Sequence, residues 1–105
     1  MKKFTVADLR PDGSRLLPGL LGDAAIAGGG VYVFKPGEVA HPEPRHVHDV
    51  AEVFIFVQGQ GVIPVDGVEV PVQAGDVVVV EAGEDHHTRS SLEDPLVAAW
   101  YLMAQ

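Results

Sequence analysis

The chain has 105 residues, enough for one domain with a single modest hydrophobic core. Fifteen acidic residues against seven basic ones give a formal net charge of −8, so nucleic acids and anionic membrane surfaces are poor partners. The absence of cysteine excludes disulfides, thiolate nucleophiles and cysteine metal ligands, and we expect a cytoplasmic protein. No stretch approaches the roughly 20 apolar residues of a membrane span, and Asp8 and Arg10 interrupt the N-terminus too early for a signal peptide.

In chain order, short segments rich in valine and aromatic residues alternate with turns rich in glycine, proline and aspartate. Residues 1–23 are expected to form one or two strands broken by proline and glycine. Residues 41–45, which contain two prolines, should be extended and lead stiffly into His46. The further expected strands are residues 24–35, 52–58, 62–65, 68–72, 77–80, 86–90 and 96–103.

The clearest turn in this series is Asp66-Gly67, a strong hairpin signal between two valine-rich segments. No helix of ordinary length is needed to account for the sequence. Short strands at intervals of about eight to twelve residues, separated by turns, predict an all-β sandwich or barrel of the jelly-roll kind.

Three histidines and a glutamate predict a metal site. His46 and His48 are two residues apart and point to the same face of an extended chain. Glu52 can return along the neighbouring strand, and His86 comes from a distant one. Three neutral imidazoles and one carboxylate suit a divalent transition metal (Mn, Fe, Ni, Cu or Zn) and leave coordination positions open. A closed structural zinc site is not expected without thiolates.

The same residues fall in a pattern that resembles the cupins, small β-barrels recognised by two motifs. The first motif here is Gly37, a spacer of eight residues, His46-Val47-His48, three residues, Glu52, six residues and Gly59. The second is Gly75, five residues, Glu81-Ala82-Gly83, two residues, His86, three residues and Ser90. The resemblance covers residues 30–103 or so and implies a single cupin domain over 1–105, folded as a double-stranded β-helix (jelly-roll) barrel.

Three departures from the cupin pattern are visible. The spacer before His46 is longer than the usual five residues, which suggests a longer loop at the mouth of the barrel. Glu81 and Ser90 stand where proline and asparagine are usual, and these changes affect a turn and a structural hydrogen bond. None of the departures removes a ligand-type residue, so the resemblance implies His46, His48, Glu52 and His86 as the metal ligands.

Other residues near the motifs have less specific roles. Phe54 and Phe56 share the face of Glu52 and should line the barrel interior, as core or as pocket wall. Tyr32 and Trp100 are similar cases, and together these four aromatic residues are the candidate substrate contacts, although aromatic residues at strand spacing are more often packing. His87 is expected to point away from the site, and His41 to be a solvated loop histidine rather than a residue of the barrel mouth. Arg45 should face outward in a surface salt bridge rather than clamp a substrate carboxylate. Glu84-Asp85 is expected to be a polar loop rather than a general base.

Two functional hypotheses stay open at this stage. The first is a metal-dependent enzyme that acts on a small polar organic molecule by a dioxygenase, isomerase or decarboxylase type of reaction. The second is a non-catalytic module that binds or senses a small ligand through the same metal; a structural or storage barrel is a weaker third. No catalytic residue beyond the metal ligands can be assigned. The resemblance also implies a homodimer, because small cupins commonly share edge strands.

Overall fold

The computed structural model describes residues 1–9, 26–41, 43 and 46–104. Among these residues the helical structure is one short 3-10 turn, and no helix is long and apolar enough to cross a membrane. The elements in chain order are β1 (Lys2–Thr5), η1 (Val6–Leu9), β2 (Ile26–Val33), β3 (Glu52–Gln58), β4 (Gln60–Val65), β5 (Val68–Gln73), β6 (Asp76–Val80), β7 (Arg89–Ser90) and β8 (Val97–Met103).

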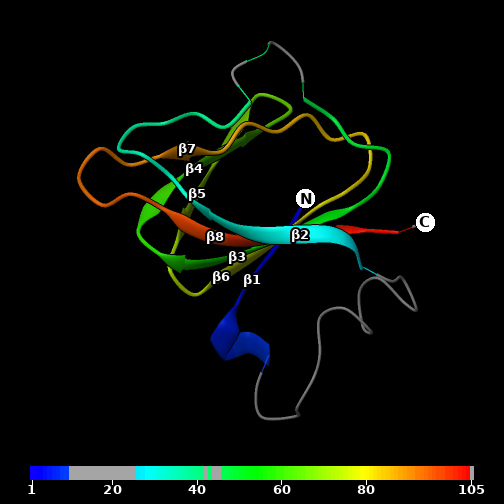
Figure 1. The fold of residues 1–105 in the computed structure, drawn as a ribbon, viewed down its shortest axis with the longest axis horizontal. Helices are drawn as coiled ribbons and strands as arrows, with labels where there is room; N and C mark the ends of the chain where they lie inside the picture. Colours follow the sequence, from blue (N-terminus) through cyan, green and yellow to red (C-terminus); the bar gives the residue numbers. More distant parts are fainter. Residues whose placement is uncertain (10–25, 42, 44–45, 105) are drawn as a thin grey trace.

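The strands form two antiparallel sheets that face each other (Figure 1). The larger sheet has five strands in the order β1-β6-β3-β8-β2, and the smaller has three in the order β5-β4-β7. Strands that are distant in sequence are neighbours in the larger sheet, as where β3 pairs with both β6 and β8. This arrangement is an all-β jelly-roll barrel, and the predicted fold class is confirmed.

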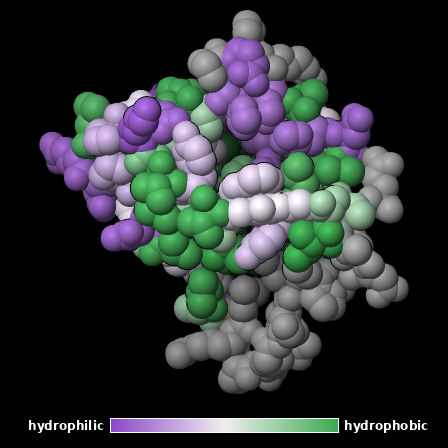
Figure 2. Space-filling model, viewed as in Figure 1, coloured by the Kyte–Doolittle hydropathy of each residue, from purple (hydrophilic) through white to green (hydrophobic). Residues whose placement is uncertain are grey.

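Strand β2 lies at the edge of the five-stranded sheet and is largely exposed. Val31 and Val33 are 68% and 67% exposed, although valine is usually buried. Figure 2, which looks at the face that carries β2, shows hydrophobic residues gathered at this part of the surface. An edge strand of this kind is a place where another chain can pair.

Most of the predicted strands are present with small changes at their ends, but the strand expected over residues 86–90 is much shorter than predicted. Only Arg89–Ser90 forms a strand there, and His86 makes an isolated bridge with Val65. The backbone amides of this segment bond to two different neighbours. The amide of His86 donates to the carbonyl oxygen of His46, and the amide of His87 donates to the carbonyl oxygen of Pro64. Of the strands expected in residues 1–23, β1 is present, and residues 10–25 lie outside the described part.

The turns follow from the residues that form them. Asp66 and Gly67 have φ values of +47° and +83°, the pair of positive angles that a tight hairpin between twisted strands requires. The four glycines of the two motifs share a left-handed backbone: Gly37 (+69°), Gly59 (+81°), Gly75 (+93°) and Gly83 (+84°). At Gly59 space is also limiting, because a Cβ atom would lie 2.0 Å from the carbonyl oxygen of Pro95.

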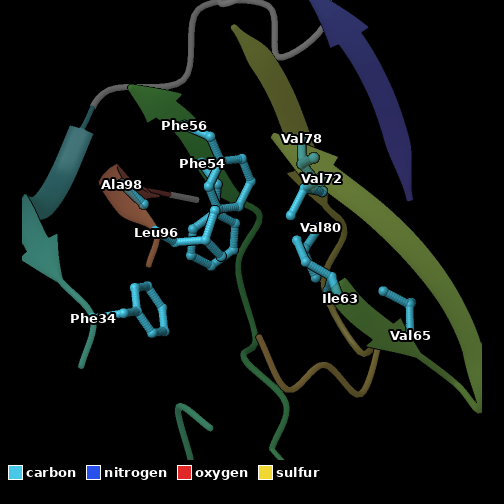
Figure 3. Packing of buried hydrophobic residues seen from close by; sticks show 10 residues of the cluster. All are labelled: Phe34, Phe54, Phe56, Ile63, Val65, Val72, Val78, Val80, Leu96 and Ala98. Atoms are coloured by element: carbon cyan, nitrogen blue, oxygen red, sulfur yellow. The ribbon is translucent and has the colours of Figure 1, made fainter. Parts of the chain in front are cut away.

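The core lies between the sheets, and alternation along the strands assigns residues to it. In β6, Val78 and Val80 point into the barrel, whereas Val77 and Val79 belong to a second cluster on the other face. Figure 3 shows the interior cluster, with aromatic rings on one side and valine and isoleucine side chains on the other. Its buried members are Phe34, Phe54, Phe56, Ile63, Val65, Val72, Val78, Val80, Leu96 and Ala98.

Candidate metal and ligand site

The four side chains predicted as metal ligands present a connected set of donor atoms. Nε2 of His46 lies 3.1 Å from Nε2 of His48, which lies 3.2 Å from Oε1 of Glu52. The same carboxylate oxygen is 3.0 Å from Nε2 of His86. Adjacent ligands of an octahedral ion with bonds of about 2.1 Å are about 3.0 Å apart. These donor separations therefore fit the edges of a coordination polyhedron around a first-row ion.

Backbone hydrogen bonds bring the two motifs to this point. The carbonyl oxygen of His46 accepts from the amide of His86 at 3.1 Å, and that of His48 accepts from Gly83 at 2.9 Å. Residues 46–48 lie outside the assigned strands, but these two bonds, two residues apart, place both imidazoles on one side as in a strand. Glu52 is the first residue of β3 and pairs with Val80 of β6 across the sheet.

Two of the imidazoles are oriented by acceptors at their other nitrogen. Nδ1 of His46 donates to Oε1 of Glu43 at 3.0 Å, and Nδ1 of His86 donates to the carbonyl oxygen of Glu84 at 3.0 Å. A proton held on Nδ1 leaves Nε2 free to bind a metal, which is the usual second contact of a histidine ligand. The tautomers that suit a metal are therefore also favoured by the surrounding protein.

Burial and charge act differently on these histidines. Burial lowers the pKa of His46, and the neighbouring His48 and His86 lower it further. Burial also acts to lower the pKa of His86, but hydrogen bonds to the Glu52 carboxylate and to the Glu84 carbonyl oxygen outweigh it and raise the pKa. The negative charge of Glu52 thus favours a cation at this position, whether a proton or a metal ion.

A second set of contacts joins the loop that carries His46 to the loop that carries His86; we call it the Asp85 clasp. Oδ1 of Asp85 accepts from the amide of His46 at 2.6 Å and from Nε2 of His87 at 2.9 Å. Nδ1 of His87 lies 2.8 Å from the carbonyl oxygen of His41. These residues were expected to be a polar loop and an outward histidine, and no spacing rule in the sequence pointed to their contacts.

His41 lies closer to the site than the sequence suggested. Its ring stacks on that of His46, with 3.5 Å between centroids and 8° between planes. Its backbone has a φ of +58°, which is uncommon for a residue other than glycine. Burial lowers the pKa of His41, and the adjacent His46 adds to this. His41 is therefore a partly exposed wall of the site, and the lead-in residues Pro42, Pro44 and Arg45 lie outside the described residues.

A cavity of about 460 Å³ opens over the predicted metal ligands. Three of those ligands, His48, Glu52 and His86, lie in its wall. Of the four aromatic residues expected to contact a substrate, Tyr32, Phe54 and Trp100 line the cavity. Phe56 is only 1% exposed and packs in the core instead, so we leave it out of the proposed ligand contacts.

Comparison with known proteins identifies the family to which the chain belongs. The family model for the cupin domain matches residues 30–102. The chain belongs to the cupin family. The matched segment contains both motifs, all of β3 to β7, the second half of β2 and β8 except its last residue.

Solved structures support the cupin fold. A cupin protein from Bacteroides fragilis matches with 21% identity and a TM-score of 0.60, covering 70% of this chain and 63% of that one. The plu4264 protein from Photorhabdus luminescens matches with 26% identity and a TM-score of 0.60, covering 70% and 59%. A Cupin 2 conserved barrel domain protein from Salinispora arenicola matches with 26% identity and a TM-score of 0.60, covering 73% and 61%. The chain thus spans less than two thirds of each of these three proteins.

Proposed function

We propose that this cupin is a metal-dependent enzyme that acts on a small polar organic molecule. The observation that carries the proposal is the convergence of four donor side chains, 3.0–3.2 Å from one to the next, beneath a cavity with aromatic walls. The proposed ligands are His46, His48, Glu52 and His86. One divalent transition metal (Mn, Fe, Ni, Cu or Zn) suits this mixture of nitrogen and oxygen donors.

The bound metal would supply Lewis acidity, or a centre for reaction with O2. The protein side chains prepare the place where this happens. Glu43 and the carbonyl oxygen of Glu84 hold two imidazoles in the tautomer that exposes Nε2. Trp100 and Phe54 offer apolar surface to the rest of the substrate and exclude water from one side of it. A dioxygenase, isomerase or decarboxylase type of reaction is compatible with this arrangement.

The alternative is a non-catalytic module that binds or senses the same kind of ligand through the metal. One observation favours it: beyond the proposed ligands, the described residues of the cavity wall offer few groups that could transfer a proton, chiefly His41 and Glu38. An enzyme that needs a protein acid or base must use one of these. A binding module needs neither.

Metal content is the first test, measured by elemental analysis of protein purified without an affinity tag or chelator. The wild-type chain should bind one ion, and His48→Ala should lose it while keeping the barrel, because His48 is half-buried and lies outside the core clusters. Glu69→Ala, an exposed change outside the cavity wall in the pair with Arg89, is the control and should keep the metal. Unchanged metal content in His48→Ala would rule out the ligand assignment.

Turnover is the second test. The metal-loaded protein is offered diols, keto acids and thiols, and O2 uptake and product formation are followed. Oxygen consumption by the iron-loaded protein would support the oxygenase type, and product without O2 uptake would support the isomerase or decarboxylase type. Tight binding without turnover would favour the binding module.

We further propose a homodimer that forms through strand β2. Its support is the edge position of β2 and the exposure of Val31 and Val33. Size-exclusion chromatography with light scattering should give twice the chain mass at micromolar concentration, and Val31→Lys should shift the mass towards the monomer. A monomeric wild-type protein over the whole concentration range would end this proposal.

A further inference from the structure

The size of the cavity limits what it can hold. At about 460 Å³ it lies near the small end of ligand pockets, which run from roughly 300 to 1,000 Å³. A molecule of about one ring with its substituents fits this space.

The two ends of the cavity differ in character. At the inner end are the most buried polar residues of the wall, Glu52, His86 and Thr88, which are 7%, 1% and 3% exposed. At the outer end Tyr32 is 42% exposed, and its hydroxyl donates to the carboxylate of Glu38. Between the ends the wall is apolar and partly aromatic, formed by Phe34, Phe54, Ala98, Trp100 and Leu102. A ligand would therefore have its polar chelating end inside and a flat apolar part along the wall.

The charged side chains that line the cavity are carboxylates. Two carboxylates, Glu38 and Glu52, line the cavity, and among its described wall residues there is no lysine or arginine. Glu38 is held in its charged form, because hydrogen bonds from the Lys35 amide and the Tyr32 hydroxyl lower its pKa. Of the other described cations, Lys2 pairs with Glu81, Lys3 with Asp76 and Arg89 with Glu69. Lys35 lies outside the cavity wall, and its charge acts on Glu38.

This charge pattern selects among chelating molecules. A divalent metal would outweigh the single charge of Glu52 and so accept one anionic donor group at the inner end. A second anionic group, further along the ligand, would find no cation in the described wall and would approach Glu38 at the mouth. Like charges brought together at a binding site weaken binding and suppress the wrong ligand.

We propose that the cavity takes a small, flat molecule that chelates through two oxygen atoms and carries no second anionic group. A neutral catechol, a hydroxy-ketone or a simple 2-oxo acid belongs to this class, whereas phosphorylated compounds, dicarboxylates and uronic acids do not. The inference rests on the proposed function, because the chelating end needs the metal.

Two near-isosteric probes test the charge rule. 3,4-Dihydroxybenzamide and 3,4-dihydroxybenzoate share the chelating catechol and differ in charge at the other end of the ring. Calorimetric titration of the full chain loaded with Zn²⁺, under argon to prevent oxidation, should show the amide binding about tenfold or more tightly than the benzoate. Equal or tighter binding of the benzoate would overturn the proposal. If that binding were lost in Arg45→Gln, Arg45 would be the cation that holds the carboxylate.

Glu38→Gln identifies the cause of the preference. Glutamine keeps one oxygen that can accept from the Lys35 amide and places an NH2 group, which can donate to the Tyr32 hydroxyl oxygen, at the other position, but it removes the negative charge. The ratio of the affinity for the amide to the affinity for the benzoate should fall several-fold in this variant, whereas the control Glu69→Gln should leave the ratio unchanged. An unchanged ratio in Glu38→Gln would contradict the role of Glu38.

Failure of this inference is distinguishable from failure of the proposed function. A chain that binds one Zn²⁺ but prefers the benzoate overturns the ligand class and leaves the metal site intact. A chain that binds no metal, or that binds the amide equally well with and without metal, overturns the chelation on which the proposed function depends.

Discussion

Asp85→Ala tests whether the Asp85 clasp, rather than the strands alone, holds the two ligand-bearing loops together. The carboxylate of Asp85 accepts two hydrogen bonds, from the amide of His46 at 2.6 Å and from Nε2 of His87 at 2.9 Å. Hydrogen bonds to a charged group contribute about 1.5–3 kcal/mol each. Because the Asp85 side chain is partly exposed and the loop can relax, we expect the free energy of unfolding of the metal-free chain to fall by about 2–4 kcal/mol.

Asp85→Ala should also weaken metal binding, and by more than a change at the exposed surface does. The clasp fixes the backbone of His46, and loss of such supporting contacts typically lowers metal affinity by about 10–100-fold. Urea unfolding followed by Trp100 fluorescence measures stability, and competition with a chelating dye measures the metal dissociation constant. Asp85→Asn keeps an acceptor oxygen and should be intermediate.

Glu69→Ala is the matched control for the clasp variants. It removes an exposed pair with Arg89 at 3.2 Å, so it should change stability by less than about 1 kcal/mol and leave the metal affinity unchanged. If Asp85→Ala unfolds more easily but binds metal as tightly as the wild type, the clasp stabilises the fold without positioning the ligands, and the reasoning above is refuted.

Two further predictions concern charge and backbone. In metal-free Glu52→Gln, the pKa of His86 should fall, because the carboxylate that raises it is gone while burial, which lowers it, remains; an unchanged histidine titration by NMR would contradict this. In the wild type the raised pKa means that protonated His86 stabilises the metal-free fold below the ordinary histidine pKa, and this contribution is lost as pH rises through the raised value. Gly75→Ala and Gly59→Ala both place alanine at a positive φ, at about 1–2 kcal/mol, but only Gly59→Ala also meets the Pro95 carbonyl at 2.0 Å. Gly59→Ala should therefore lower the urea midpoint more, and equal midpoints would show that the close contact has no consequence.

The fold was largely predictable because its signals are local. Strand β3 was predicted with its observed bounds, since its run of β-branched and aromatic residues between Glu52 and Gln58 is a property of the segment itself. The Asp66-Gly67 turn was predictable for the same reason. The strand over residues 86–90 was predicted too long, because the amides of its first two residues bond to His46 and Pro64, and no local pattern indicates two different partners.

The candidate site was predictable only in part. The ligand-type residues could be named from the spacing of the two motifs, which places side chains on known faces of strands. The clasp and the stacked His41 could not be predicted. The contacts of the clasp join residues 39 and 46 positions apart, and the position of His41 depends on a left-handed backbone at a non-glycine residue. Such contacts follow from how two loops meet and not from the composition of either.

An anomalous-diffraction map from a crystal of the Mn²⁺-loaded protein tests the central claim most directly. The account predicts one ion, within about 2.3 Å of Nε2 of His46, His48 and His86 and of Oε1 of Glu52. The chain offers a rival position, since His41 and Glu43 form a second potential site with the other nitrogen of His46. An ion at that rival position, or no ordered ion at all, would contradict the account.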